Sequence, residues 1–125
     1  MLGSRCADLE PRPPRRCGAI ILADQQHLRR ILEHAVVPVF AVAGSALWQP
    51  TRGSPAQAFA RQVAMYLAHV GLGLSQRRIA SLFARDRRTV AHACALVEDR
   101  RDCARFDRAL DLLEGVLHLV SPRPA

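Results

Sequence analysis

Apolar residues recur along most of the chain at three- and four-residue intervals, which is the spacing of amphipathic α-helices. The pattern predicts a first helix over residues 24–36, with Asp24 as its N-cap. We expect Pro38 to end this helix, because proline lacks the backbone N–H that a continuing helix needs. The apolar face of this helix comprises Leu28, Ile31, Leu32 and Ala35.

Further helices are predicted in close succession. A short apolar link over residues 39–42 leads to a small helix that ends near Trp48, and a loop rich in proline follows over residues 49–55. The remaining helices are predicted over residues 55–70, 76–84, 86–101 and 102–120. The last helix carries an apolar stripe of Phe106, Leu110, Leu113, Leu117 and Val120. Because no stretch alternates with the period of a strand, the predicted fold class is all-α.

The chain of 125 residues has room for one domain and a tail. Residues 1–18 are predicted to form a disordered tail rich in arginine and proline, because no apolar period develops there. A basic arm that binds phosphates is the alternative interpretation of this segment. Residues 19–121 form the predicted helical domain.

The charge of the chain narrows the choice of partners. There are 18 lysine-plus-arginine residues, all of them arginine, against 11 acidic residues, for a formal net charge of +7. The absence of lysine excludes a Walker A loop, which needs one, and also excludes Schiff-base chemistry. An excess of arginine favours polyanionic partners, either nucleic acid or an acidic membrane surface.

No segment predicts insertion into a membrane or export. The apolar stretch from Val36 to Trp48 contains Pro38 and Gly44 and is too short to cross a bilayer. The apolar run over residues 19–23 is too short for a signal peptide. We therefore expect a cytoplasmic protein whose four cysteines are reduced thiols.

Residues 75–101 have the pattern of a helix-turn-helix motif: a short helix, a tight turn and a longer second helix. In such motifs the N-terminal residues of the second helix reach base edges in the major groove. Between Ser75 and His92 the sequence has five arginines and one acid, Asp86, a local charge of +4. The arginines are Arg77, Arg78, Arg85, Arg87 and Arg88. At 100° per residue, the side chains that point outward on the second helix, or flank that face, are Arg87, Arg88, Thr89 and His92.

Two classes of function fit this pattern. The first is a sequence-selective protein that binds double-stranded DNA. The second is an adaptor whose basic helix face binds an acidic protein partner or a membrane surface, since a basic turn between amphipathic helices is also common on soluble proteins. DNA binding predicts an affinity that falls steeply with salt and differs among duplex sequences, whereas an adaptor shows no sequence preference.

Short motifs spread over the chain resemble one protein family. They are Arg61 to Leu67, Leu74-Ser75, Ile79, Phe83 to Asp86, Thr89-Val90 and His92 to Cys94. In this order and spacing they resemble the DNA-binding C-terminal domain of the bacterial replication initiator DnaA, over about residues 27–120. The resemblance implies an all-α domain with a helix-turn-helix motif, preceded by a basic loop that reaches the minor groove.

The resemblance also places DNA contacts on this sequence. Arg61 and Gln62 match a pair that approaches the phosphate backbone, and Arg52 lies where the family has its minor-groove arginine. Matches at the head of the recognition helix are Arg85, Asp86, Thr89 and His92. Together with the basic residues of the motif, the candidate DNA-binding residues are Arg52, Arg61, Gln62, Arg77, Arg78, Arg85, Asp86, Arg87, Arg88, Thr89 and His92.

The sequence departs from the family pattern in the motif itself. The family's His-Thr pair is Arg87-Arg88 here, and arginine at base-reading positions favours guanine or adds phosphate contacts. Family members have an acidic residue after the serine that corresponds to Ser75, whereas this sequence has Arg77-Arg78 there. Ala84 replaces a turn glycine, which costs about 1 kcal/mol if the turn is left-handed. The family's ATPase module is not in this sequence, so we expect no ATP hydrolysis and no origin melting by the chain alone.

No other group of residues predicts a metal site or a catalytic site. Neither His92 with Cys94 nor His27 with His34 supplies the four ligands of a zinc site, so we expect no metal. Cys94 is expected to turn inward and His92 outward, which argues against a nucleophile and predicts a protein that is not an enzyme and uses no cofactor or nucleotide. The predicted function is control of transcription or replication at the nucleoid, by occupying sites on double-stranded DNA. An exposed part of the stripe over residues 106–120 could also mediate homo-oligomers.

Overall fold

The structure, a computed structural model, describes the backbone of residues 17–120 and the side chains of residues 25–120. Residues 1–16, most of the predicted tail, lie outside the described residues. The elements in chain order are α1 (Cys17–Phe40), the 3-10 helix η2 (Gly44–Leu47), α2 (Pro55–Val70), α3 (Gln76–Phe83), α4 (Arg87–Arg100) and α5 (Ala104–Val120). The predicted all-α fold class is confirmed, and in this part of the chain no helix is long and apolar enough to span a membrane.

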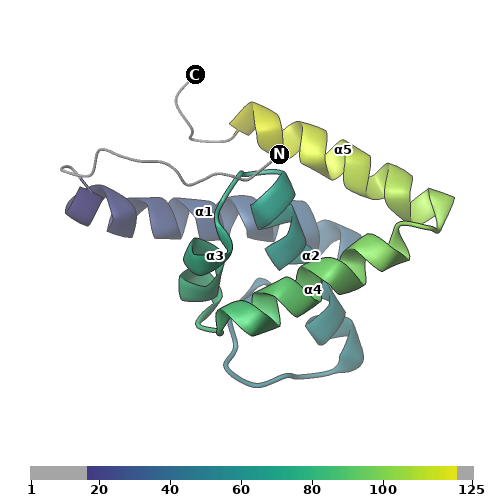
Figure 1. The fold of residues 1–125 in the computed structure, drawn as a ribbon, viewed down its shortest axis with the longest axis horizontal. Coiled ribbons are helices and arrows are strands. Elements are labelled where there is room, and N and C mark those ends of the chain that lie inside the picture. Colours follow the sequence, from purple (N-terminus) through teal and green to yellow (C-terminus); the bar gives the residue numbers. More distant parts are fainter. Residues whose placement is uncertain (1–16, 121–125) are drawn as a thin grey trace.

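Helix α2 lies at the centre of the arrangement and contacts each of the other helices (Figure 1). Ser54 and Gln57 begin it with a capping box, and Pro55 occupies the first turn, where its missing N–H costs nothing. The interior is built mainly from small and aliphatic residues. Its members on α2 include Ala60, Val63, Ala64, Met65, Leu67 and Ala68, all at most 1% exposed.

Helix α1 differs from its predicted bounds at both ends. It begins at Cys17, so Asp24 lies inside the helix and the prediction of Asp24 as its N-cap is wrong. The prediction that Pro38 ends the helix is also wrong, because the helix continues through it. Proline in a last turn removes only one backbone hydrogen bond, and the N–H of Ala41 still donates to the carbonyl of Val37 at 2.8 Å.

A cluster of charges around Arg101 fixes the turn between α4 and α5. Its guanidinium forms ion pairs with Asp107, Asp111 and Glu114, three acids on successive turns of α5. It also donates to the hydroxyl of Tyr66 on α2 at 2.9 Å. Because one side chain joins three helices, it sets the direction in which α5 crosses the domain.

The apolar stripe of α5 faces the core only in part. Leu110 and Leu117 are each 1% exposed. A Cβ added at Gly71 would lie 2.9 Å from Leu117 Cδ1, so the absence of a side chain there lets α5 approach the end of α2. Val120, which the stripe predicted to face the core, is 47% exposed because it borders an open hollow between α1 and α5.

Candidate nucleic-acid interface

Helices α3 and α4 meet across a turn at residues 84–86, as the helix-turn-helix pattern predicted. Ser75 caps α3 by accepting the N–H of Arg78 at 3.1 Å, and Asp86 caps α4 by accepting the N–H of Thr89 at 2.7 Å. The hydrogen bonds from Thr89 hold the pKa of the Asp86 carboxyl below its ordinary value. The carboxylate therefore stays ionised at neutral pH and anchors the start of α4.

Ala84 gives the turn its shape through an unusual backbone conformation. It has φ 55° and ψ 46°, in the left-handed region that glycine adopts without strain. The N–H of the next residue, Arg85, donates to the carbonyl of Ala80 at 2.9 Å and closes the end of α3. Because the Ala84 side chain is exposed, no burial of its methyl group offsets the backbone strain.

We expect Ala84→Gly to raise the free energy of unfolding by about 0.5–1 kcal/mol, since glycine removes the left-handed strain. Urea unfolding followed by circular dichroism measures this change. The matched control Ala91→Gly makes the same substitution at an exposed position inside α4, where it should lower the free energy of unfolding by about 1 kcal/mol. A loss in both variants would show that the turn is not left-handed in solution.

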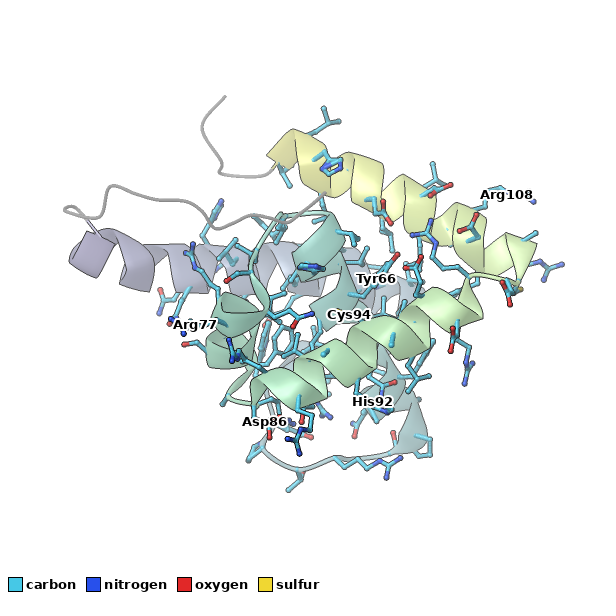
Figure 2. All side chains as sticks on the ribbon, viewed as in Figure 1. Tyr66, Arg77, Asp86, His92, Cys94 and Arg108 are labelled. Carbon is cyan, nitrogen blue, oxygen red and sulfur yellow. The ribbon has the colours of Figure 1, made fainter. Side chains whose placement is uncertain are left out.

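The first turns of α4 present a narrow, basic face to solvent. Arg87, Arg88 and His92 are exposed on it, and the neighbouring exposed residues Ala91 and Ala95 are small. The inward residues are Val90, Ala93 and Val97. The acidic residues of the helix come only in its last turns, and Figure 2 shows His92 on the side of α4 that faces the loop before α2. A slim helix of this kind can enter a major groove, which is about 12 Å wide.

Two arginines tether the loop between η2 and α2 to the helix-turn-helix motif. Arg85, in the turn, donates to the carbonyl of Gln49 at 2.8 Å. Arg61, on α2, donates to the carbonyls of Ala46 at 2.8 Å and of Arg52 at 3.2 Å. These bonds hold the backbone that carries the exposed Arg52 side chain next to α4.

The Arg61 side chain lies beneath this loop rather than on the surface. It is 5% exposed, and burial, together with the positive charge of Arg85, lowers the pKa of its guanidinium. Its Nε is buried and has no hydrogen-bond partner among the described residues. The phosphate contact of Arg61 stays a prediction, and the geometry adds a second role, which is to position Arg52.

A polar groove of about 460 Å³ lies between the loop, α2 and α4. The predicted DNA-binding residues that line it are Arg52, Arg61, Gln62, Arg85, Thr89 and His92. They come from three separate segments of the chain, which only folding brings together. Because no acid lines the groove in the described part of the chain and three of its residues are arginines, it offers positive charge to an anion.

The other predicted DNA-binding residues surround this groove or extend the basic surface along α3. Asp86, Arg87 and Arg88 stand at the start of α4, and Arg77 and Arg78 lie in the first turn of α3. Figure 2 shows Arg77 on α3 and Asp86 at the start of α4. Arg77 is exposed and Arg78 is half-buried. The structure thus places all the predicted residues on the motif or on the segments that adjoin it.

The sequence pattern did not indicate the residues that hold Trp48, which follows η2 and precedes the loop. Trp48 Nε1 donates to the Glu33 carboxylate on α1, 15 positions earlier, at 2.5 Å. The Trp48 ring packs on Phe83 with centroids 4.7 Å apart, and the guanidinium of Arg29 lies 4.9 Å from the Trp48 ring centroid. No spacing along the chain signals these contacts, because each joins residues that lie far apart in the sequence.

Cys94 packs against the core, as predicted, and is half-buried. Burial, and to a smaller extent the charge of Glu98, raises the pKa of its thiol to about 11. The thiol therefore stays protonated at neutral pH, whereas the thiolate is the form that acts as a nucleophile. His92 is exposed on the outer face of the same helix.

Comparisons with known proteins agree with this geometry. The family model described as Bacterial dnaA protein helix-turn-helix matches residues 30–97, more than half of the chain. The fold is similar to a solved chain titled crystal structure of DNA replication initiation factor, with a TM-score of 0.68 and 28% sequence identity. That similarity covers 80% of this chain and 30% of the solved chain, and no curated protein sequence matches. The chain belongs to the bacterial DnaA helix-turn-helix family.

Proposed function

We propose that this protein binds double-stranded DNA with sequence selectivity and controls transcription or replication by occupying its sites. Helix α4 enters the major groove, where Arg87 and Arg88 face base edges. The loop that carries Arg52 lies over the adjacent minor groove, and Arg77 contacts phosphate at the edge of the site. A protein with this function is expected at the nucleoid.

One observation carries the proposal: the acid-poor, basic start of α4 stands beside a groove lined by three arginines. A helix face that reads bases needs positive charge on both of its sides, because the duplex presents a phosphate strand on each side of the major groove. The arginine-tethered loop supplies this charge on one side of α4, and the start of α3 supplies it on the other. Membership of the family supports the same docking.

Selection of bound duplexes from a random pool, followed by binding isotherms at several salt concentrations, tests the proposal. We expect an enriched sequence whose affinity exceeds that of random duplexes by about 10³-fold or more. We also expect the logarithm of the binding constant to fall linearly with the logarithm of the salt concentration. A protein that binds all duplexes equally would not be sequence-selective, and one that forms no saturable duplex complex would not be a DNA-binding protein.

Arg77→Ala is expected to weaken binding to every duplex by a similar factor, because a phosphate contact carries no sequence information. The slope of the salt dependence should fall by about one unit. The matched control is Arg108→Ala, which removes the same charge from an exposed position on α5, far from the start of α4 (Figure 2). Equal slopes for Arg77→Ala and Arg108→Ala would place Arg77 outside the interface.

A further inference from the structure

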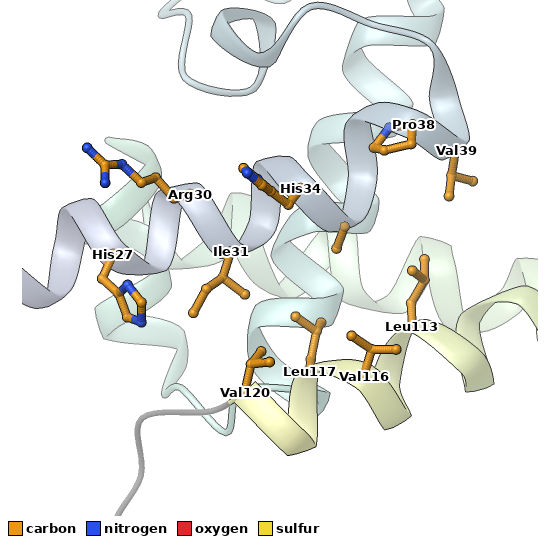
Figure 3. Close-up of a pocket in the computed structure, with 11 residues that line it drawn as sticks. His27, Arg30, Ile31, His34, Pro38, Val39, Leu113, Val116, Leu117 and Val120 are labelled. Carbon is orange, nitrogen blue, oxygen red and sulfur yellow. The ribbon is translucent and has the colours of Figure 1, made fainter.

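A second hollow, apolar rather than polar, lies between α1 and α5. Its volume is about 650 Å³. The apolar residues that line it include Ile31, Pro38 and Val39 from α1, with Leu113, Val116 and Val120 from α5. In Figure 3 Ile31 points from α1 towards α5, and the four labelled α5 residues point towards α1. No residue is shared with the arginine-lined groove beside α4.

Five large apolar side chains are exposed in the described part of the chain, and three of them, Val39, Val116 and Val120, line this apolar groove. The other two, Leu112 and Leu119, lie on α5 outside the lining, and the exposures of the five range from 47% to 86%. Three of them, Leu112, Val116 and Leu119, follow one another at intervals of four and three residues along one flank of α5. Apolar side chains that are scattered singly over a surface need no explanation, but a contiguous group beside a hollow is typical of an interaction site.

The polar residues that line the apolar groove are all basic. They are His27, Arg30 and His34, which follow one another along α1 at intervals of three and four residues, and no acid lines the groove among the residues whose side chains the structure describes. The three acids on α5 do not compensate, since Asp107, Asp111 and Glu114 all form ion pairs with Arg101 in the turn before that helix. These three residues form a basic rim, and an occupant that complements it carries negative charge.

We propose that the groove between α1 and α5 binds an amphipathic α-helix of another protein, with acidic residues beside its apolar stripe. An elongated hollow between two helices receives the apolar side chains of a third helix at positions i, i+3 or i+4, and i+7. The acidic flank of that helix lies along His27, Arg30 and His34. Since the proposed DNA interface uses other residues, this partner and a duplex can bind at the same time.

Charge also argues against the other occupants. A second copy of the chain seated face to face would bring two basic rims together, and Arg105 and Arg108 on the outer part of α5 would add to the repulsion. Residues 1–16 are themselves basic and contain no apolar period, and residues 121–125 contain no large apolar side chain. An acidic partner is therefore the occupant that the described surface fits.

The test uses two labelled helical peptides that share one leucine stripe but carry either glutamates or lysines on its flanks. Fluorescence anisotropy on the full chain should show saturable binding of the glutamate peptide, with the lysine peptide at least about tenfold weaker. Arg30→Glu should reverse this preference. Equal binding of the two peptides, or no binding of the glutamate peptide, would overturn the proposal.

Val116→Glu should reduce the affinity for the glutamate peptide by about tenfold or more, because it places a charge in the apolar groove. Val116 is 53% exposed, so the fold tolerates the change. The matched control Ala95→Glu adds the same charge at an exposed position of α4 and should leave the peptide affinity within about twofold. Since the peptide assay contains no DNA, its outcome is independent of the proposed DNA binding.

Two further measurements separate the other occupants. Sedimentation equilibrium that shows a dimer, lost in Val116→Glu, would assign the groove to a second copy. Flotation with phosphatidylglycerol–phosphatidylcholine vesicles, lost in the same variant while the glutamate peptide fails to bind, would assign it to a lipid surface. Either result would overturn the proposal. A monomeric protein that does not float with the vesicles and binds the glutamate peptide would support it.

Discussion

Replacing Arg88 with alanine is expected to lower the affinity for the selected duplex by about 1–3 kcal/mol, a factor of roughly 5 to 150. Arg88 is exposed in the first turn of α4 and shares its outward face with His92. A guanidinium there can donate two hydrogen bonds to O6 and N7 of guanine. The loss on random duplexes should be smaller, so that selectivity falls together with affinity, and the same holds for Arg87→Ala if Arg87 is the residue that reads the base.

The double substitution Arg87→His with Arg88→Thr restores the pair that the family resemblance implies at these positions. If the framework docks as in the family, this variant should shift its preference towards the family's DNA box. Isotherms for the parent protein, Arg88→Ala and the double variant on selected, family-box and random duplexes measure both effects. A uniform loss on every duplex, with no shift, would make both arginines phosphate contacts and leave DNA binding itself in place.

Replacing Arg61 with methionine should lower the free energy of unfolding by about 1.5–3 kcal/mol. The substitution keeps the aliphatic part of the side chain but leaves the carbonyl of Ala46, a fully buried residue, without its charged donor. It also releases the carbonyl of Arg52. Arg108→Met makes the same change at an exposed position of α5 and should leave the stability within about 0.5 kcal/mol. Similar small losses in both variants would show that the buried contacts of Arg61 do not stabilise the fold.

DNA affinities of Arg61 and Arg52 variants distinguish two possible roles of Arg61, which are to position Arg52 and to contact phosphate. Arg61→Lys keeps the charge and loses the geometry, so it avoids the cost of removing the charge altogether. If Arg61 acts by holding the loop, the loss of affinity in Arg61→Lys should largely disappear when Arg52 is already alanine. If Arg61 contacts phosphate directly, the losses from the two sites should add.

Local signals along the chain were sufficient to predict the bounds of most helices. The predicted helices over residues 55–70, 76–84 and 86–101 agree with α2, α3 and α4 to within one residue at each end. Ser54, Ser75 and Asp86 cap these helices by bonds to residues three positions on, so their effect is readable in sequence. The C-terminal bound of α1 was wrong because propensity rules treat proline as a stop, whereas the last turn of a helix tolerates it.

The sequence by itself therefore determined the helices, the motif and the exposed arginines at the start of α4, because periodicity and capping act over one or two helical turns. Only the tertiary structure decided that Arg61 is buried beneath the loop and that Arg85 bonds to Gln49, 36 positions away. The same is true of the apolar groove between α1 and α5. These features depend on the angles at which helices cross, and those angles follow from packing between residues whose separation along the chain carries no signal.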